Sequence, residues 1–161
     1  MGVDAITSKE IDIHNHHGSM LQVSGRGVLI EGASGSGKTS LALGLIDWFK
    51  AKGHGALMVS DDQVILSHGE ADGTLFLKAD APETIKGKVE LYGLGIVDTP
   101  SIRSSQVDLI VRLIPDQLIE RMPEERYDQL RGVLIPLLEV PERHEAQSIR
   151  LVNAKLELLF G

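Results

Sequence analysis

The sequence contains no cysteine, which excludes disulfide bonds, zinc–thiolate sites and thiol nucleophiles. Aromatic residues are also scarce, at 4% of the chain, so leucine, isoleucine, valine and alanine must supply the core. No apolar run approaches the roughly 20 residues that a membrane-spanning helix needs. Residues 1–12 are polar and mixed, without the apolar stretch of a secretion signal. We therefore expect a cytoplasmic protein with no membrane partner.

A basic surplus is missing too. The chain has 16 lysines and arginines against 23 aspartates and glutamates, for a net charge of −7. Nonspecific nucleic-acid binding needs a basic surface that displaces counterions from phosphates. We therefore expect no nucleic-acid partner, although several arginines fall within residues 103–150. The length of 161 residues and a hydrophobic content of 42% fit one domain over residues 1–161, with residues 1–12 as a polar tail.

The spacing of apolar residues predicts an α/β protein. Residues 28–32 and 56–60 are short apolar runs typical of buried strands, and the apolar face of residues 38–52 predicts a helix between them. Further strands are predicted at 63–68, 74–78, 89–92 and 107–114, and a last helix at 144–159. Residues 127–140 are ambiguous between helix and strand. The pattern favours a mixed sheet flanked by helices, with one strong strand–loop–helix unit.

One motif lies between the first predicted strand and helix. It matches G-x-x-x-x-G-K-[ST] in full and comprises Gly32, Ala33, Ser34, Gly35, Ser36, Gly37, Lys38 and Thr39. Glycines allow the backbone to wrap around phosphates, the lysine reaches the terminal phosphates and the threonine hydroxyl can bind Mg²⁺. The alternative is a Gly/Ser-rich turn that contains a lysine. The flanking strand and helix favour a phosphate loop for ATP and Mg²⁺.

Two adjacent carboxylates, Asp61 and Asp62, end the second apolar strand. In phosphate-loop enzymes a carboxylate at this place holds Mg²⁺ or its waters, and a second one can take a proton from the attacking hydroxyl. The alternative is a solvated turn, which aspartate also favours. The phosphate loop upstream favours the functional interpretation. Which of the two carboxylates is the base stays open.

Several enzyme families share a phosphate loop followed by an acidic pair, and residues elsewhere in the chain distinguish among them. His17-Gly18 lies 15 residues before Gly32, and Glu90 opens a segment that continues through Gly93-Leu94-Gly95-Ile96. Residues 116–121 and 138–143 follow in order. Over roughly residues 14–156 this set resembles the catalytic domain of HPr kinase/phosphorylase. This bacterial enzyme phosphorylates a serine of the phosphocarrier protein HPr and can reverse that step with inorganic phosphate.

The resemblance implies a fold similar to phosphoenolpyruvate carboxykinase and an ATP- and Mg²⁺-dependent protein-serine kinase acting on an HPr-type carrier. It implies a homo-oligomer, a hexamer, and we expect the N-terminal regulatory domain of longer members to be absent. The catalytic residues it implies are His17, Lys38, Asp61, Asp62 and Arg121. The Mg²⁺ ligands it implies are Thr39, Asp62 and Glu90. Residues 140–145 match a mobile loop important for phosphorolysis.

The chain departs from the family pattern at Tyr92, where arginine is usual, and at Glu142 and Glu145 in the phosphorolysis loop. These changes favour the kinase direction over phosphorolysis. Individual residues have alternative interpretations: His17 as a surface histidine, and Arg121 as one charge on an exposed helix. Two other functions also stay open. One is a small-molecule kinase or carboxykinase-like enzyme, and the other is a nucleotide-binding regulatory module with little turnover.

Overall fold

The computed structural model of the chain describes residues 13–161, so the predicted polar tail lies outside the described residues. Its helices are α2 (Lys38–Ala51), the short 3₁₀ helix η1 (Asp116–Leu118) and α3 (Glu145–Phe160). Its strands in the first half are β1 (His14–His17), β2 (Ser19–Val23), β3 (Arg26–Glu31), β4 (Ala56–Ser60), β5 (Gln63–Ala71) and β6 (Thr74–Asp80). Those in the second half are β7 (Lys88–Leu91), β8 (Gly95–Asp98), β9 (Ser104–Gln106), β10 (Leu109–Ile114), β11 (Arg126–Leu130) and β12 (Val133–Pro141).

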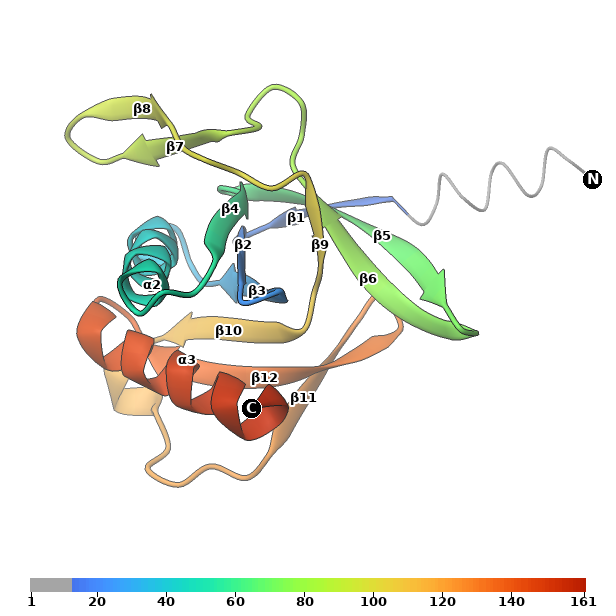
Figure 1. Ribbon diagram of the computed structural model, residues 1–161. Helices are drawn as coiled ribbons and strands as arrows, with labels where there is room; N and C mark the ends of the chain where they lie inside the picture. The colour runs from blue at the N-terminus through green and yellow to red at the C-terminus, as the bar shows by residue number, and fades with distance from the viewer. Residues whose placement is uncertain (1–12) are drawn as a thin grey trace, which may run out of the picture.

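The central layer is a six-stranded mixed sheet in the order β11-β12-β10-β3-β2-β4. Strand β10 runs parallel to both β3 and β12, whereas the other pairs are antiparallel. The four-stranded antiparallel sheet β1-β5-β6-β9 packs against one face, and α2 and α3 cover the other (Figure 1). The predicted mixed sheet with helices is confirmed, but the helices cover one face only, and the second sheet on the other face was not predicted.

Alternating side chains of the central strands divide the core into two parts. In β2, Leu21 faces the helices with Leu41 and Leu45 of α2, while its neighbour Met20 faces the four-stranded sheet. Strands β3 and β10 alternate in the same way, which is why their sequences are nearly continuous apolar runs. The central sheet is therefore covered on both faces.

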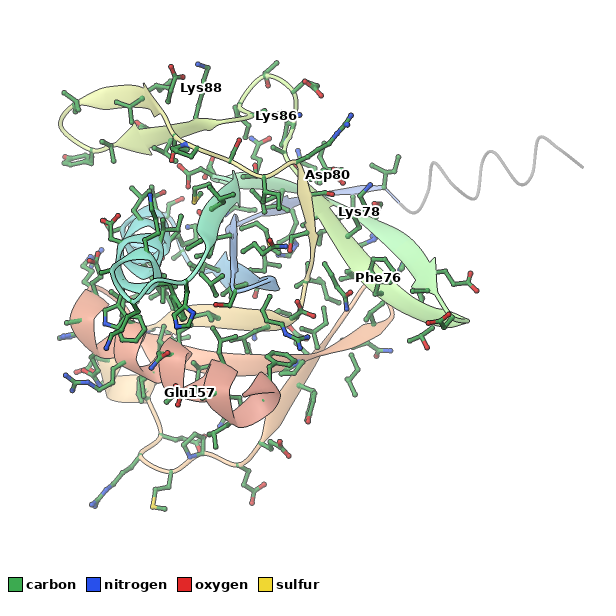
Figure 2. The ribbon with its side chains drawn as sticks, in the orientation of Figure 1. Phe76, Lys78, Asp80, Lys86, Lys88 and Glu157 are labelled. Atoms are coloured by element: carbon green, nitrogen blue, oxygen red, sulfur yellow. The ribbon has the colours of Figure 1, made fainter. Side chains whose placement is uncertain are left out.

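The hairpin of β7 and β8 stands apart from both sheets (Figure 1). One face of it packs on the helix side of the core through Val89, Leu91 and Val97. The other face is open to solvent and carries Lys88, whose Nζ lies 2.9 Å from Asp98 Oδ1 (Figure 2). Glu90 and Ile96 are paired in register on the hairpin and are both exposed.

Most predicted elements match the structure. The strands at 28–32 and 56–60, the helix at 38–52 and the last helix correspond to β3, β4, α2 and α3. The ambiguous segment 127–140 is a hairpin of β11 and β12, turned by Arg131 and Gly132 at positive φ. No helix among residues 13–161 is long and apolar enough to cross a bilayer.

Candidate active site

The glycine-rich loop that the sequence predicts to bind phosphates, called the phosphate loop below, joins the end of β3 to the start of α2, as its motif requires. Gly35 and Gly37 adopt φ of 77° and 101°, values that a side chain would penalise. At Gly32 an added Cβ would lie 2.5 Å from Ser36 Oγ and 3.0 Å from Leu113 Cβ, so a side chain there would force its neighbours to move. These three glycines give the loop the tight backbone course that a phosphate cradle needs.

Lys38, the first residue of α2, spans the loop. Its side chain is 8% exposed, and Nζ donates hydrogen bonds to the carbonyl oxygens of Gly32 at 3.0 Å and Ala33 at 3.1 Å. These carbonyls are neutral acceptors, so the ammonium group has no carboxylate partner in any ion pair of the described residues. The charge of Lys38 is thus held in place and can interact with an anion that enters the loop.

Asp61 is the buried carboxylate of the acidic pair, at 6% exposure. Its Oδ1 accepts hydrogen bonds from Thr39 Oγ1 and from Ser19 Oγ, both at 2.8 Å. Because the Thr39 proton goes to Asp61, the lone pairs of the threonine oxygen remain free for a metal ion. Asp61 therefore orients the hydroxyl that the motif assigns to Mg²⁺.

Asp62 lies on the solvent side of the same turn. Its side chain is 67% exposed, and Oδ1 lies 3.0 Å from His17 Nε2, whose N–H donates to it. Its backbone has a φ of 69°, a left-handed conformation that aspartate tolerates better than most residues. The two neighbouring carboxylates thus have separate surroundings: one is buried beside two hydroxyls and one is exposed beside a histidine.

The contacts of Asp61 with Ser19 and of Asp62 with His17 form where the chain passes from one sheet to the other. Between β1 and β2 it passes from the four-stranded to the six-stranded sheet, and between β4 and β5 it passes back. Gly18 lies at the first crossing, and its N–H donates to the Asp62 carbonyl oxygen at 2.9 Å. An added Cβ on Gly18 would lie 2.8 Å from the Ile30 carbonyl oxygen. Glycine after His17 therefore has a steric cause.

Most of the predicted site residues line one pocket of about 870 Å³. It is lined by His17, Lys38, Thr39, Asp61, Asp62, Glu90 and the loop residues Ser34, Gly35 and Gly37, among others. The backbone N–H of Glu90 lies 3.5 Å from Asp61 Oδ2, a long contact. Arg121 does not line this pocket: it lies in the exposed segment 120–125 between η1 and β11, and is not on a helix.

An ion-pair network lies beside the loop at the end of β3. Glu31, the residue before Gly32, is 2.7 Å from His16 Nε2 and accepts hydrogen bonds from Arg112, which also pairs with Asp128. Burial raises the pKa of Glu31, but the hydrogen bonds from His16 and Arg112 outweigh it, so the pKa is lowered overall. The network ties β1, β3, β10 and β11 together just before the phosphate loop.

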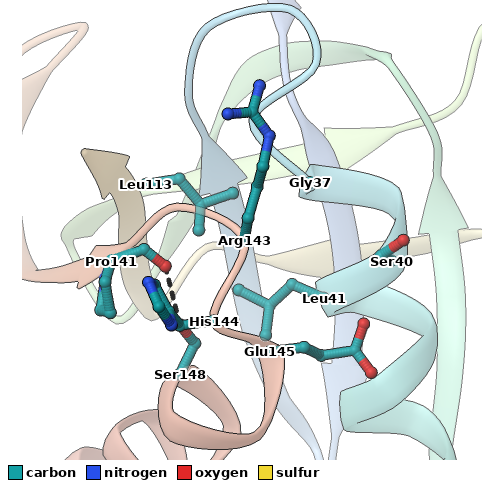
Figure 3. A pocket seen from close by; sticks show the side chains of 9 residues that line it. All are labelled: Gly37, Ser40, Leu41, Leu113, Pro141, Arg143, His144, Glu145 and Ser148. Atoms are coloured by element: carbon teal, nitrogen blue, oxygen red, sulfur yellow. Dashed lines mark hydrogen bonds between the residues drawn. The ribbon is translucent and has the colours of Figure 1, made fainter. Parts of the chain in front are cut away.

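Sequence reasoning gave no role to Ser19, and it placed Arg143 in the segment 140–145 without predicting its contact with the glycine-rich loop. Ser19 follows His17 by two positions, and only its contact with Asp61 reveals a role. Arg143 precedes α3, and its side chain extends toward the phosphate loop (Figure 3), where Nη2 donates to the Gly35 carbonyl oxygen at 2.9 Å. The two residues are 108 positions apart, so no local pattern could have indicated this contact.

The fold and the site define a mixed α/β protein with a phosphate loop facing an acidic pair. Comparisons with known proteins show the family to which this fold belongs. Residues 9–158 match the family model of the HPr serine kinase C-terminal domain. The HPr kinase/phosphorylases of Chlorobium phaeobacteroides and Chlorobium limicola are 34% and 37% identical over 137 and 139 residues, each covering 78% of this chain. The chain spans only 40% and 39% of those relatives.

The solved structure of the Hpr(Ser) kinase/phosphatase from Coxiella burnetii has the same fold, with a TM-score of 0.72 at 23% identity. It covers 92% of this chain, and this chain covers 99% of it. The protein therefore belongs to the HPr serine kinase C-terminal domain family, and the predicted resemblance is confirmed.

Proposed function

We propose that this protein is an ATP- and Mg²⁺-dependent kinase that phosphorylates a serine of an HPr-type phosphocarrier. The observation that carries the proposal is the single pocket lined by Lys38, Thr39, the buried Asp61 and the exposed pair of His17 and Asp62. Its relatives are named HPr kinase/phosphorylase. With ATP and a phosphocarrier as substrates, the protein would act in the cytoplasm, in a fold of the phosphoenolpyruvate-carboxykinase type.

The donor set fits Mg²⁺ bound with nucleotide phosphates. Mg²⁺ usually takes one or two protein oxygens plus phosphates and waters, and no group of three histidine, aspartate or glutamate side chains among residues 13–161 is arranged to hold a metal ion without a ligand. Thr39 and Glu90 would hold the ion, and Asp61 would orient Thr39. The exposed Asp62, also predicted as a ligand, is better placed for proton transfer. When bound, Mg²⁺ would offset charge on the phosphates.

Asp62 would be the base. The substrate serine hydroxyl gives its proton to the Asp62 carboxylate, and its oxygen forms a bond to the γ-phosphorus as the bond to the β–γ bridging oxygen breaks and ADP leaves. His17 donates to Oδ1 of that carboxylate, which holds the group in place and leaves Oδ2 free to take the proton. Lys38 would neutralise charge on the phosphates.

Exposure of the base favours a protein substrate. Asp62 is 67% and His17 51% exposed, so a serine on the surface of a folded protein can reach the carboxylate. A small-molecule kinase excludes water around its substrate, and here the base is open to solvent. Arg121 as a catalytic residue and a hexameric assembly stay predictions from the resemblance.

The test incubates purified protein with γ-labelled ATP, Mg²⁺ and an HPr-type carrier, with a serine-to-alanine carrier as the control. Label on the wild-type carrier alone supports the proposal. Label on a metabolite would favour the small-molecule kinase. Nucleotide binding without any transfer would favour a regulatory module. Starting from phosphorylated carrier and inorganic phosphate tests the reverse direction.

A further inference from the structure

The strand that carries His17 lies at the edge of the smaller sheet. β1 pairs with β5, and no other strand among residues 13–161 pairs with it. Adjacent side chains of a strand point to opposite faces. His17 lines the pocket of the proposed site, and its neighbour His16 therefore faces the other way, toward the end of β3.

His16 makes a contact that links β1 to the central sheet. Its side chain is 18% exposed, and its Nε2 lies 2.7 Å from Glu31 Oε2. The lowered pKa of Glu31 keeps its carboxylate ionised at neutral pH, and an ionised carboxylate only accepts, so the histidine N–H is the donor. Arg112 holds the other oxygen of this carboxylate, Oε1, from Nε at 3.0 Å and from Nη2 at 2.7 Å.

Glu31 is also the residue that precedes the phosphate loop. The carbonyl oxygen of the next residue, Gly32, accepts a hydrogen bond from Lys38 Nζ at 3.0 Å. One buried carboxylate therefore joins the start of the loop to the strand that carries His17. Hydrogen bonds to an ionised group are shorter and stronger than neutral ones, so this contact can fix the spacing between the two segments.

The position of the proposed base depends on this contact. Asp62 is 67% exposed, and the contact with His17 at 3.0 Å is the one hydrogen bond of its carboxylate among residues 13–161. The N–H of Gly18 holds the Asp62 carbonyl oxygen, but it does not direct the side chain. His17 can hold the carboxylate only where β1 places it, and His16 anchors β1 one residue away.

Phosphoryl transfer depends strongly on such spacing, because it is catalysed mainly by positioning and charge stabilisation. Reacting atoms must lie about 3 to 3.5 Å apart, and a misplacement of about 1 Å can cost about 10²-fold in rate. Resting on the proposed function, we propose that His16 is a positioning residue. Through Glu31 it fixes the pair of His17 and Asp62 relative to the phosphate loop.

The experiment compares two substitutions of His16, one that keeps a donor and one that removes it. Glutamine can place an amide N–H near the position of Nε2, whereas phenylalanine keeps a ring without a donor. The matched control is Asp128→Ala. It removes the outer partner of Arg112, 2.6 Å from Nη2, and leaves the contact between His16 and Glu31 in place.

Three measurements are made on each variant. Label transfer from γ-labelled ATP to an HPr-type carrier gives kcat, calorimetry gives the dissociation constant of ATP, and urea unfolding gives the stability. We expect His16→Phe to lower kcat about tenfold or more and to leave the ATP dissociation constant within about twofold, since Lys38 and the loop are unchanged. His16→Gln should restore most of the rate, and Asp128→Ala should keep the wild-type rate although its stability falls.

A double-mutant cycle tests the route through the base. In the Asp62→Asn background, His16→Phe should cost little further rate, because His16 is proposed to act through that carboxylate. Rate losses that add fully would overturn the positioning role. So would a His16→Phe rate within about twofold of wild type, a His16→Gln rate no higher than that of His16→Phe, or an equal loss in Asp128→Ala.

Hydrogen exchange of the Gly18 amide gives a readout that needs no substrate. This N–H donates to the Asp62 carbonyl oxygen at 2.9 Å, and it should exchange about tenfold faster or more in His16→Phe. Exchange should be unchanged in Asp128→Ala. Equal exchange in the wild type and in His16→Phe would overturn the anchoring of β1 by His16 while leaving the proposed kinase intact. A wild-type protein that transfers no label to the carrier would instead overturn the proposed function itself.

Discussion

Replacing Asp62 with asparagine tests whether this residue is a catalytic base or only part of a structural turn. Asparagine keeps the size of the side chain and can still accept the hydrogen bond from His17, but it cannot take the serine proton. General-base catalysis contributes roughly 10²- to 10⁴-fold, so the transfer rate should fall by about that factor. This corresponds to about 3 to 5 kcal/mol on the activation barrier.

Stability should hardly change in the same variant. The two partners are 51% and 67% exposed, and ion pairs in such surroundings contribute about 0 to 1 kcal/mol. The left-handed backbone of residue 62 is also tolerated by asparagine. The expected rise in the activation free energy is therefore several times the loss in the free energy of unfolding, and the two can be measured separately.

The assay is the initial rate of label transfer from γ-labelled ATP to the carrier at saturating substrates, combined with urea unfolding. A double-mutant cycle with His17→Ala adds a second criterion, because His17 is proposed to act through Asp62. In the Asp62→Asn background the His17 substitution should cost little further rate. A variant that keeps its rate within about tenfold of wild type, or two substitutions whose effects add fully, would refute the assignment.

Four further predictions test the remaining parts of the site. Lys38→Ala should weaken binding of a fluorescent ATP analogue at least about tenfold in an equilibrium titration, since it removes the cation of the loop; unchanged affinity would contradict the phosphate loop. Asp61→Asn should raise the Mg²⁺ concentration needed for half-maximal rate, with an unchanged requirement counting against its link to Thr39. The lowered pKa of Glu31 means that its stabilisation is present above the ordinary glutamate pKa of about 4.3 and is lost as the pH falls through the folded value. Urea unfolding of Glu31→Gln should therefore show reduced stability at pH 7 and a shallower acid decline than wild type. Tyr92→Arg should raise the phosphate-dependent removal of phosphate from the carrier, since phosphorolysis brings a second anion to the pocket; no rise would exclude Tyr92 as the cause of a kinase bias.

The parts of the fold that the sequence predicted depend on signals between near neighbours. The loop from Gly32 to Thr39 lies between an apolar run and an amphipathic segment, and each signal spans only a few residues. The same holds for Asp61 and Asp62 at the end of β4. In these places local propensity and tertiary structure agree, so the motif and its setting could be predicted together.

The parts that could not be predicted depend on distant pairing. Residues 127–140 form a hairpin whose turn has a left-handed backbone at both Arg131 and Gly132, with φ of 49° and 82°. Glycine is a common turn residue, but arginine gives no such signal in a sequence. The network at Glu31 joins residues up to 81 positions apart. The spacing of apolar residues shows only which face of a strand is apolar. It does not show which other strand carries the residues that pair with Glu31.

The division of labour between the two carboxylates is a consequence of how the chain moves between its sheets. Ser19 and His17 flank Gly18 at one crossing, and Asp61 and Asp62 form the other. A regular strand would point adjacent aspartates to opposite faces of a sheet. Here the left-handed turn at Asp62 and the bond from Gly18 to its carbonyl keep both acids in one pocket, one buried and one exposed. Aspartate is one of the few non-glycine residues that adopt this conformation readily, so the turn can place an acid at this position. Aligned strands alone would not produce this arrangement, so the two sheet crossings are themselves part of the site.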